Sequence, residues 1–177
     1  MPNIYLIRHT TPNIAKGICY GRLDVDVAAS FATEAAGILA ALSTAHIATF
    51  YSSPAQRCSK LAHHLAGENR VQIDPRLQEI NFGQWEGKNF NDIPRAQIDA
   101  WVADVENYVM PRGESPAMCR DRAQLFFNEH IQTATQNCAV IAHGGSIKAL
   151  LSIVANQPLA AVAQWEIAFG AVVAFKL

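Results

Sequence analysis

The chain has 177 residues, half of them hydrophobic and 16% charged, which is typical of one globular domain and not of a disordered chain. The net charge is −1 and no basic run occurs, so the sequence argues against a nucleic-acid partner. The first apolar stretch is too short for a secretory signal, and polar residues interrupt the apolar C-terminus, so we expect no membrane span. Four cysteines without paired spacing, Cys19, Cys58, Cys119 and Cys138, indicate free thiols in a reducing cytoplasm.

The first half of the chain alternates between short apolar runs, typical of buried strands, and longer runs with helical periodicity. Phe31, Ala35, Ile38 and Leu42 form one apolar stripe, and Ser53-Pro54 is typical of a helix start. We expect, in chain order, a strand at residues 3–8, a loop at 16–26, a helix at 28–42, a strand at 48–51, a helix with Ser53 as its N-cap and Pro54 as its first residue, and a strand at 71–74.

The second half begins with an irregular segment, residues 77–115, whose glycines and prolines are typical of a lid or pocket wall. Ser115-Pro116 then repeats the Ser-Pro helix start. We expect a helix from there to about residue 133, a strand at 138–142, a helix with Ile147, Leu150, Leu151 and Val154 on its apolar face, and an edge strand at 171–175. Because no repeat or linker divides the chain, we expect a single domain over residues 1–177.

Alternating strands and helices with nearly continuous apolar strands predict an α/β fold, in three α/β/α layers around a mostly parallel sheet. Ligands of such sheets bind at the carboxyl ends of the strands. Arg8-His9 follows the first strand and His143 follows the apolar strand at 138–142, so both histidines are expected at that edge.

These residues suggest phosphoryl transfer, because one histidine can attack phosphorus while the other stabilises charge, and an adjacent arginine favours an anionic substrate. Gly144 and Gly145 open a helix after His143, and the amides and positive dipole at a helix start favour an anion. Each residue alone has a plainer interpretation. His9 and Arg8 would be solvated where a strand ends, Arg57 would be a helix-surface arginine and Glu79 an ordinary solvated carboxylate.

Taken together, four motifs resemble the histidine phosphatase superfamily in its phosphoglycerate-mutase-like branch. They are Leu6-Ile7-Arg8-His9, Ser52-Ser53-Pro54-Ala55-Gln56-Arg57, the run from Arg76-Leu77-Gln78-Glu79 to Trp85-Glu86-Gly87, and Ile141-Ala142-His143-Gly144-Gly145. They occur in the family's order over most of the chain. Within the superfamily, Gly17-Ile18-Cys19-Tyr20-Gly21-Arg22-Leu23-Asp24-Val25 looks most like the alpha-ribazole phosphatase group.

The resemblance implies a phosphomonoesterase that acts through a phosphohistidine on a small phosphate ester, with alpha-ribazole 5′-phosphate as a candidate substrate. It implies that neutral His9 is the nucleophile, that Arg8, Arg57 and His143 bind the phosphoryl oxygens, and that Glu79 is the general acid and then the general base. A backbone carbonyl is expected at the other ring nitrogen of His9. No metal or other cofactor is expected, because these residues supply the positive charge.

The sequence departs from the family pattern beside the nucleophile. Thr10 and Thr11 stand where Gly and Glu are usual, Ala15 stands where a phosphate-contacting Asn is usual, and Asn13 is the nearest Asn. Phe31 also replaces a common Gly. The residues expected to bind substrate are Arg8, Thr10, Asn13, Tyr20, Gly21, Arg22, Arg57, His143 and Gly144.

Several other residues have two interpretations each. Trp85, Trp101 and Tyr20 could stack on an aromatic leaving group, and packing of the tryptophans in the core or lid is the alternative. Glu86 is interpreted as structural, although it competes with Glu79 as the acid, and Glu114 as part of a helix start. His63 and His64, adjacent on a helix, have poor spacing for a metal and are expected at the surface.

Two other functions remain open. One is a phosphoglycerate-type mutase, which the short chain disfavours because such mutases have additional segments that cover the site. The other is a non-catalytic module that binds phosphorylated ligands, for which the substitutions at Thr10 and Thr11 are the only support. The protein is expected to be a monomer or a homodimer; the final strand could be a dimer edge, and an edge strand within one chain is the simpler interpretation.

Overall fold

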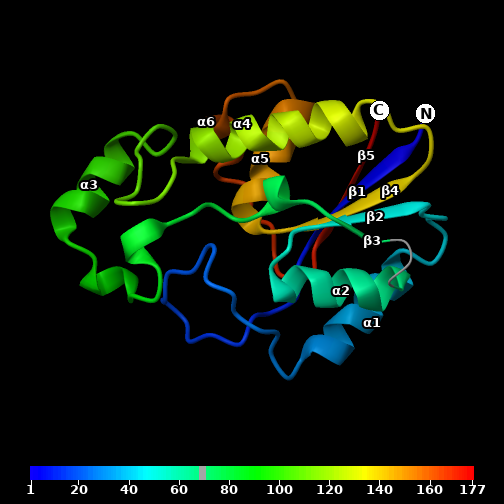
Figure 1. Cartoon of the computed structure of the whole chain (residues 1–177), viewed down its shortest axis with the longest axis horizontal. Helices are drawn as coiled ribbons and strands as arrows, with labels where there is room; N and C mark the ends of the chain where they lie inside the picture. Colours follow the sequence, from blue (N-terminus) through cyan, green and yellow to red (C-terminus); the bar gives the residue numbers. More distant parts are fainter. Residues whose placement is uncertain (68–70) are drawn as a thin grey trace.

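A five-stranded sheet runs through the part of the chain that the structure, a computed structural model, describes, which is residues 1–67 and 71–177 (Figure 1). The strands are β1 (Asn3–Arg8), β2 (Thr49–Ser52), β3 (Val71–Ile73), β4 (Cys138–Ala142) and β5 (Val172–Lys176), in the order β3-β2-β4-β1-β5. All neighbours pair in parallel except β5, which runs antiparallel to β1 at the edge. The expected mostly parallel sheet and the expected edge strand are therefore confirmed.

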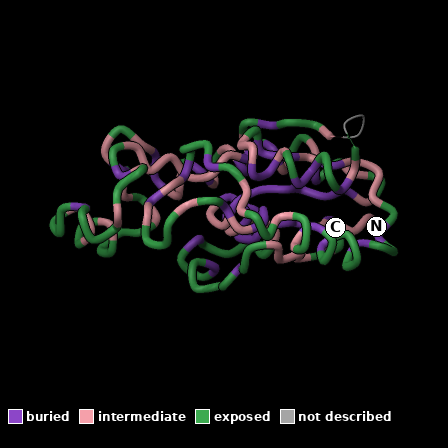
Figure 2. Tube along the Cα trace, turned by 90° about the horizontal axis from the view of Figure 1, so that it is seen from below, coloured by how far each residue is buried: buried purple, intermediate pink, exposed green. Residues whose placement is uncertain are grey.

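Helices cover both faces of this sheet, as the three-layer prediction requires (Figure 1). On one side lie α1 (Phe31–Ala41) and α2 (Gln56–Ala66), and on the other lie α4 (Pro116–Phe126), α5 (Gly144–Val154) and α6 (Leu159–Val162). Alternate residues of a strand point to opposite faces. Accordingly Ile4 and Leu6 pack with the α4 and α5 layer, whereas Ile7 packs with the α1 and α2 layer. Buried residues lie mainly along the sheet and the helix faces turned toward it (Figure 2).

Some element boundaries differ from the expectations. The first helix begins at Phe31 and not at Ala28, whose amide instead donates to the carbonyl of Thr11. The strand expected at 71–74 ends at Ile73, because the Asp74 carboxylate accepts from the Arg76 amide and starts a 3₁₀ turn. The helix that begins after Ser115 is capped as expected, with Ser115 Oγ 3.2 Å from the Met118 amide, and it continues past Phe126 as a π turn. The short helix α6 was not expected.

The segment at residues 77–115 is more ordered than the prediction of an irregular stretch. It contains the helix α3 (Arg95–Ala103) and short 3₁₀ turns at Gly83–Trp85 and Phe90–Asp92. It has a small core of its own, in which Trp85, Ile93 and Met110 pack with Cys19. In Figure 1 this segment projects to the left of the sheet. Because Trp85 is buried and packs against Trp101, the packing interpretation of the tryptophans holds, and stacking of Trp85 on a ligand was wrong.

The strand register brings together the residues that follow β1, β2 and β4. Arg8 lies opposite Ala142, and Ser52 lies opposite Ile141. The next residues continue this pairing, since the His9 amide donates to Ala142 O at 3.1 Å and the Ser53 amide to Ile141 O at 3.0 Å. His9, Ser53 and His143 therefore leave the sheet at one edge. No helix in the described residues is long and apolar enough to cross a membrane.

Candidate active site

His9 is almost fully buried where β1 ends, and its Nδ1 lies 2.7 Å from the Thr10 carbonyl oxygen. This contact is the one expected, and a hydrogen bond from Nδ1–H leaves Nε2 with a free lone pair. Burial lowers the pKa of His9 from 6.5 to about 3, and the charges of Arg57 and Arg8 act in the same direction. Burial is the larger cause, and the two arginines add to it. The result is a neutral imidazole at neutral pH.

Arg57 is a buried residue in the first turn of α2, so the plain interpretation as a surface arginine was wrong. Its Nη1 donates to Leu23 O at 3.0 Å and its Nη2 to Gly21 O at 2.7 Å. The cation also lies 5.4 Å from the centre of the Tyr20 ring. Arg57 thus holds the loop at residues 20–24 against the sheet edge.

Arg8 is held from the other side of the site. Its Nη1 donates to Ile167 O, and its guanidinium carbon lies 4.0 Å from the centre of the Phe169 ring. The same Phe169 ring has its centre 5.5 Å from that of His9. Phe169, which the sequence reasoning did not single out, therefore packs beside both His9 and Arg8.

Among the described residues, three of the buried polar atoms without a hydrogen-bond partner belong to the two chain neighbours of His9 and to Arg57, whose charge acts on His9. They are Arg8 Nε, Arg57 Nε and Thr10 Oγ1. Buried donors are normally paired, and orphaned ones are costly. Unpartnered guanidinium and hydroxyl groups of this kind fit an oxyanion such as a phosphoryl group.

His143 is the N-cap residue of α5 and is buried with its ring centre 5.1 Å from that of His9. Its Nε2 lies 2.8 Å from Ser53 Oγ and 3.5 Å from Cys58 Sγ. Burial, followed by the nearby charge of Arg57, holds the pKa of His143 well below its ordinary value. Sequence reasoning missed the Ser53 and Cys58 contacts, because Ser53 resembled a helix cap and a lone cysteine carries no signal.

Glu79 reaches the start of α5 and occupies the amides expected to bind an anion. Its Oε2 accepts from the Gly145 amide at 3.0 Å, and its Oε1 accepts from the Ser146 and Ile80 amides at 3.2 and 2.9 Å. A Cβ on Gly145 would lie 2.4 Å from Glu79 Oε1, so only glycine permits this contact. The carboxylate is thereby fixed in a pocket that His143 also lines.

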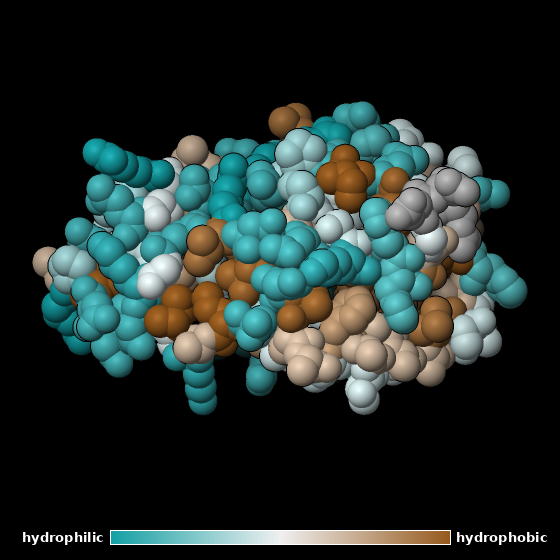
Figure 3. Space-filling view, turned by 60° about the horizontal axis from the view of Figure 1, so that its bottom comes forward, coloured by the Kyte–Doolittle hydropathy of each residue, from teal (hydrophilic) through white to brown (hydrophobic). Residues whose placement is uncertain are grey.

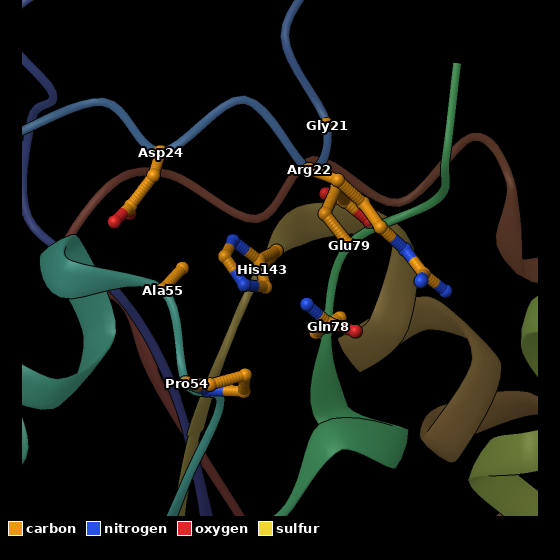
Figure 4. Close-up of a pocket in the computed structure, with 8 residues that line it drawn as sticks. All are labelled: Gly21, Arg22, Asp24, Pro54, Ala55, Gln78, Glu79 and His143. Atoms are coloured by element: carbon orange, nitrogen blue, oxygen red, sulfur yellow. The ribbon is translucent and has the colours of Figure 1, made fainter. Parts of the chain in front are cut away.

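A pocket of about 230 Å³ opens between the 20–24 loop, the start of α2 and the chain at 78–79. Figure 4 shows His143 at its centre, Asp24 and Ala55 on one side, and Arg22, Gln78 and Glu79 on the other. Its lining consists of Gly21, Arg22, Asp24, Pro54, Ala55, Gln78, Glu79 and His143. These described lining residues include both signs of charge and no aromatic ring other than the imidazole.

The start of α2 shows why Ser53 is free to contact His143. The helix begins at Gln56 with Ala55 as its N-cap, so the expected start at Ser53-Pro54 was wrong by two residues. The cap comes from outside the helix, because Asp24 Oδ1 accepts from the Gln56 amide at 2.9 Å. A carboxylate here also complements the helix dipole.

The structure brings most of the expected substrate-binding residues to the site. Gly21 and Arg22 line the pocket, Tyr20 lies against Arg57, and Gly144 adjoins Arg8, whose guanidinium carbon would be 3.5 Å from a Cβ on that glycine. Asn13 is exposed and is not among the residues that line the pocket. Among the other expected residues, Arg8, Thr10, Tyr20, Arg57 and Gly144 do not line this pocket either.

The remaining carboxylates have structural contacts. Glu86 accepts from the amides of Arg22, Leu23 and Phe82, in agreement with its structural interpretation. Glu114 does not simply start a helix, as was expected; it is a buried partner of Arg122 and accepts from the Asn81 amide.

The last group of residues comprises the cysteines and the pair of adjacent histidines on α2. All four cysteines are buried and free of disulfides, and His63 and His64 are exposed on α2. In residues 1–67 and 71–177, no group of three or more His, Cys, Asp or Glu side chains could hold a metal ion.

Comparison with known proteins places this site in a family. The model of the histidine phosphatase superfamily (branch 1) matches residues 4–177. A Hydrogenobacter thermophilus protein named "Putative phosphoserine phosphatase 2" is 30% identical over 86% of this chain and 78% of its own length. The Escherichia coli adenosylcobalamin/alpha-ribazole phosphatase is 25% identical over 92% of this chain and 83% of its own.

The solved structures agree in fold. The alpha-ribazole phosphatase from Shigella flexneri superposes with a TM-score of 0.89 over 99% of this chain and 90% of that chain, at 21% identity. Because the family model matches residues 4–177, almost the entire chain, the chain belongs to the histidine phosphatase superfamily.

Proposed function

We propose that this phosphatase is a metal-independent phosphomonoesterase in which His9 carries the phosphoryl group. The observation that carries the proposal is a buried His9 whose pKa is lowered by burial and by the charges of Arg57 and Arg8, together with unpartnered polar atoms on Arg8, Arg57 and Thr10. Such donors bind phosphoryl oxygens and repel a proton from the imidazole. They therefore favour attack on phosphorus and disfavour protonation of the nucleophile.

The reaction has two steps. In the first, His9 Nε2 forms a bond to phosphorus while the ester P–O bond breaks, and Glu79 supplies the proton to the leaving alkoxide. In the second, the Glu79 carboxylate takes a proton from water, the water oxygen attacks phosphorus, and the His9–phosphorus bond breaks to release inorganic phosphate. His143 and the two arginines stabilise the charge on the transferred group in both steps.

The pocket favours a compact, polar leaving group. Its volume is about 230 Å³, and Arg22, Asp24 and Glu79 give it charges of both signs. A group with both an amino and a carboxyl function, as in phosphoserine, matches this lining, and one relative carries a phosphoserine phosphatase name. Alpha-ribazole 5′-phosphate is the second candidate, because another relative is named for it.

The test is hydrolysis of 4-nitrophenyl phosphate in EDTA by the wild type, by His9→Ala and by His63→Ala. His63 is exposed on α2 and serves as the matched histidine control. We expect metal-independent turnover that His9→Ala abolishes and His63→Ala retains. Rapid-quench experiments with ³²P-labelled ester should trap an acid-labile, base-stable phosphoenzyme in the wild type only. Full activity of His9→Ala would show that the nucleophile is another residue.

A panel of natural esters would then identify the substrate class. L-Phosphoserine, alpha-ribazole 5′-phosphate and 3-phosphoglycerate should be compared by kcat/KM, with phosphate release and isomerisation followed separately. We expect hydrolysis of phosphoserine to exceed that of the aromatic nucleoside-like ester. Formation of 2-phosphoglycerate without phosphate release would establish the mutase alternative, and binding of esters without turnover the non-catalytic one.

A further inference from the structure

The chain around Glu79 has little regular structure, yet two side chains form hydrogen bonds with its backbone at residues 76, 79 and 81. Arg122, on α4, donates from Nη1 to Arg76 O and from Nη2 to Glu79 O at 3.0 Å. Glu114 Oε1 accepts from the Asn81 amide at 2.9 Å. The Glu114 amide in turn donates to Asn81 O at 2.9 Å. The backbone is therefore held on both sides of Glu79.

The two side chains that hold it also hold each other. Arg122 Nη2 lies 2.8 Å from Glu114 Oε1, and the exposed fractions of the two side chains are only 15% and 9%. Burial alone would raise the pKa of Glu114, but the hydrogen bond and charge of Arg122 hold that pKa below its usual value. A largely buried pair of charges adds little net stability, because the cost of desolvation offsets the attraction, whereas removal of one partner leaves the other unpaired.

The pair also reaches the substrate pocket. Arg22 Nη2 lies 3.5 Å from Glu114 Oε2, and Arg22 lines the pocket together with Glu79. The Arg22 amide is bound by Glu86 at 2.9 Å. Glu114 therefore links the loop that carries Arg22 to the chain that carries Glu79.

We propose that Arg122 and Glu114 are positioning residues for the proton transfer by Glu79. They fix the Glu79 backbone so that its carboxylate stays on the Gly145 and Ser146 amides, in the pocket that His143 lines. Neither touches the reacting atoms. The inference rests on the acid role given to Glu79 in the proposed function.

Dependence on the leaving group separates this role from general support of the fold. An acid is needed most when the leaving group is a poor one, and least for 4-nitrophenolate. Single-turnover rates of phosphoenzyme formation should be measured with phenyl phosphate and 4-nitrophenyl phosphate, for the wild type, Glu79→Gln, Arg122→Lys and Glu114→Gln. Arg120→Lys is the matched control, because Arg120 is on the same helix and donates to Ser152 Oγ instead.

We expect Glu79→Gln to slow phenyl phosphate cleavage about 10²-fold more than 4-nitrophenyl phosphate cleavage. Arg122→Lys and Glu114→Gln should also slow phenyl phosphate cleavage more than 4-nitrophenyl phosphate cleavage, by about 10-fold. Arg120→Lys should slow both to the same extent. If Arg122→Lys does not fold, Glu114→Gln alone carries the test, since it preserves shape and removes charge.

Three results would overturn the proposal. Equal losses on both esters in the Arg122 and Glu114 variants, with selectivity retained in Glu79→Gln, would show that the pair only supports the fold. The same selectivity in Arg120→Lys would show that any change in α4 produces it. No selectivity in Glu79→Gln would refute the acid role itself, and the positioning role with it.

Discussion

The carboxyl edge of the sheet and the segment at residues 77–115 both build the site, but different interactions hold them in place. At the sheet edge, His9 and His143 follow strands whose register and apolar packing position them. In the segment, Glu79 is positioned by a guanidinium, a carboxylate and the amides of α5. Parallel pairing thus fixes the groups that we propose act on the phosphoryl group, and polar contacts fix the group that we propose acts on the leaving group.

The surfaces of the two regions differ as well. The segment has only a small core around Trp85 and leaves Val102, Val105 and Val109 exposed, whereas the strands of the body pack into two larger clusters. On the face shown in Figure 3, most of the surface is hydrophilic and the apolar side chains gather toward the middle. If the roles divide in this way, a change at the sheet edge should affect phosphoryl binding. A change in the segment at residues 77–115 should affect departure of the leaving group.

The largest effect is expected from Arg57→Ala, at the sheet edge. It removes a buried cation from the phosphoryl site and two donors from the carbonyls of Gly21 and Leu23. We expect kcat/KM to fall about 10³-fold, equally for phenyl and 4-nitrophenyl phosphate, because the phosphoryl group is common to both. Lys60→Ala, an exposed change on the same helix, should retain activity. A loss that differs between the two esters would contradict the division of roles.

A smaller, selective effect is expected from Gly145→Ala, where the two regions meet. Its Cβ would lie 2.4 Å from Glu79 Oε1 and 2.9 Å from Ile80 Cδ1, so the carboxylate must leave the α5 amides. We expect phenyl phosphate cleavage to fall about 10²-fold and 4-nitrophenyl phosphate cleavage to fall much less.

Gly37→Ala is the matched control for that change. No atom of the described chain outside its own helix backbone lies within 4 Å of a Cβ there, so it should retain activity. It should also raise the free energy of unfolding by about 0.5–1 kcal/mol, since alanine is the better helix former. Equal losses on both esters in Gly145→Ala would mean that the glycine supports folding and not the acid.

The same contrast explains what the sequence could predict. Apolar runs and helical stripes located every strand and both helices beside β1 and β2, because burial in a parallel sheet imposes those patterns. The two histidines followed from their position after such strands. Arg57 and Glu79 came from the family resemblance, because each alone looks like an ordinary surface residue.

Contacts between distant side chains were not predictable from local patterns. Nothing near Ser53 indicates that its hydroxyl faces His143, since the carboxylate that caps α2 comes from Asp24. Likewise, Glu114 resembles a first-turn residue until Arg122 is placed beside it. Regular packing leaves a periodic signal in sequence, whereas a long-range ion pair leaves none.

The smallest expected effect is on the free energy of unfolding. The two histidines at the sheet edge and Glu114 in the segment should change it in different pH ranges. A lowered folded pKa means that the unfolded chain binds protons first, so His9 and His143 destabilise the fold as pH falls below 6.5. Each contributes a slope of up to about 1.4 kcal/mol per pH unit, which for His9 ends near pH 3. Glu114 also has a lowered pKa, but its stabilising contribution is lost only as pH falls below its ordinary value of 4.5.

Urea unfolding at pH 8, 6.5 and 5.5, in buffers without phosphate, measures this difference. We expect the free energy of unfolding to change little between pH 8 and 6.5 and to fall below 6.5, before Glu114 begins to titrate. His9→Gln removes one titrating imidazole and should reduce that fall by about half, whereas Glu114→Gln should leave it unchanged in this range. An unchanged fall in His9→Gln would show that folding does not lower the pKa of His9, which would contradict the effect of burial on this imidazole.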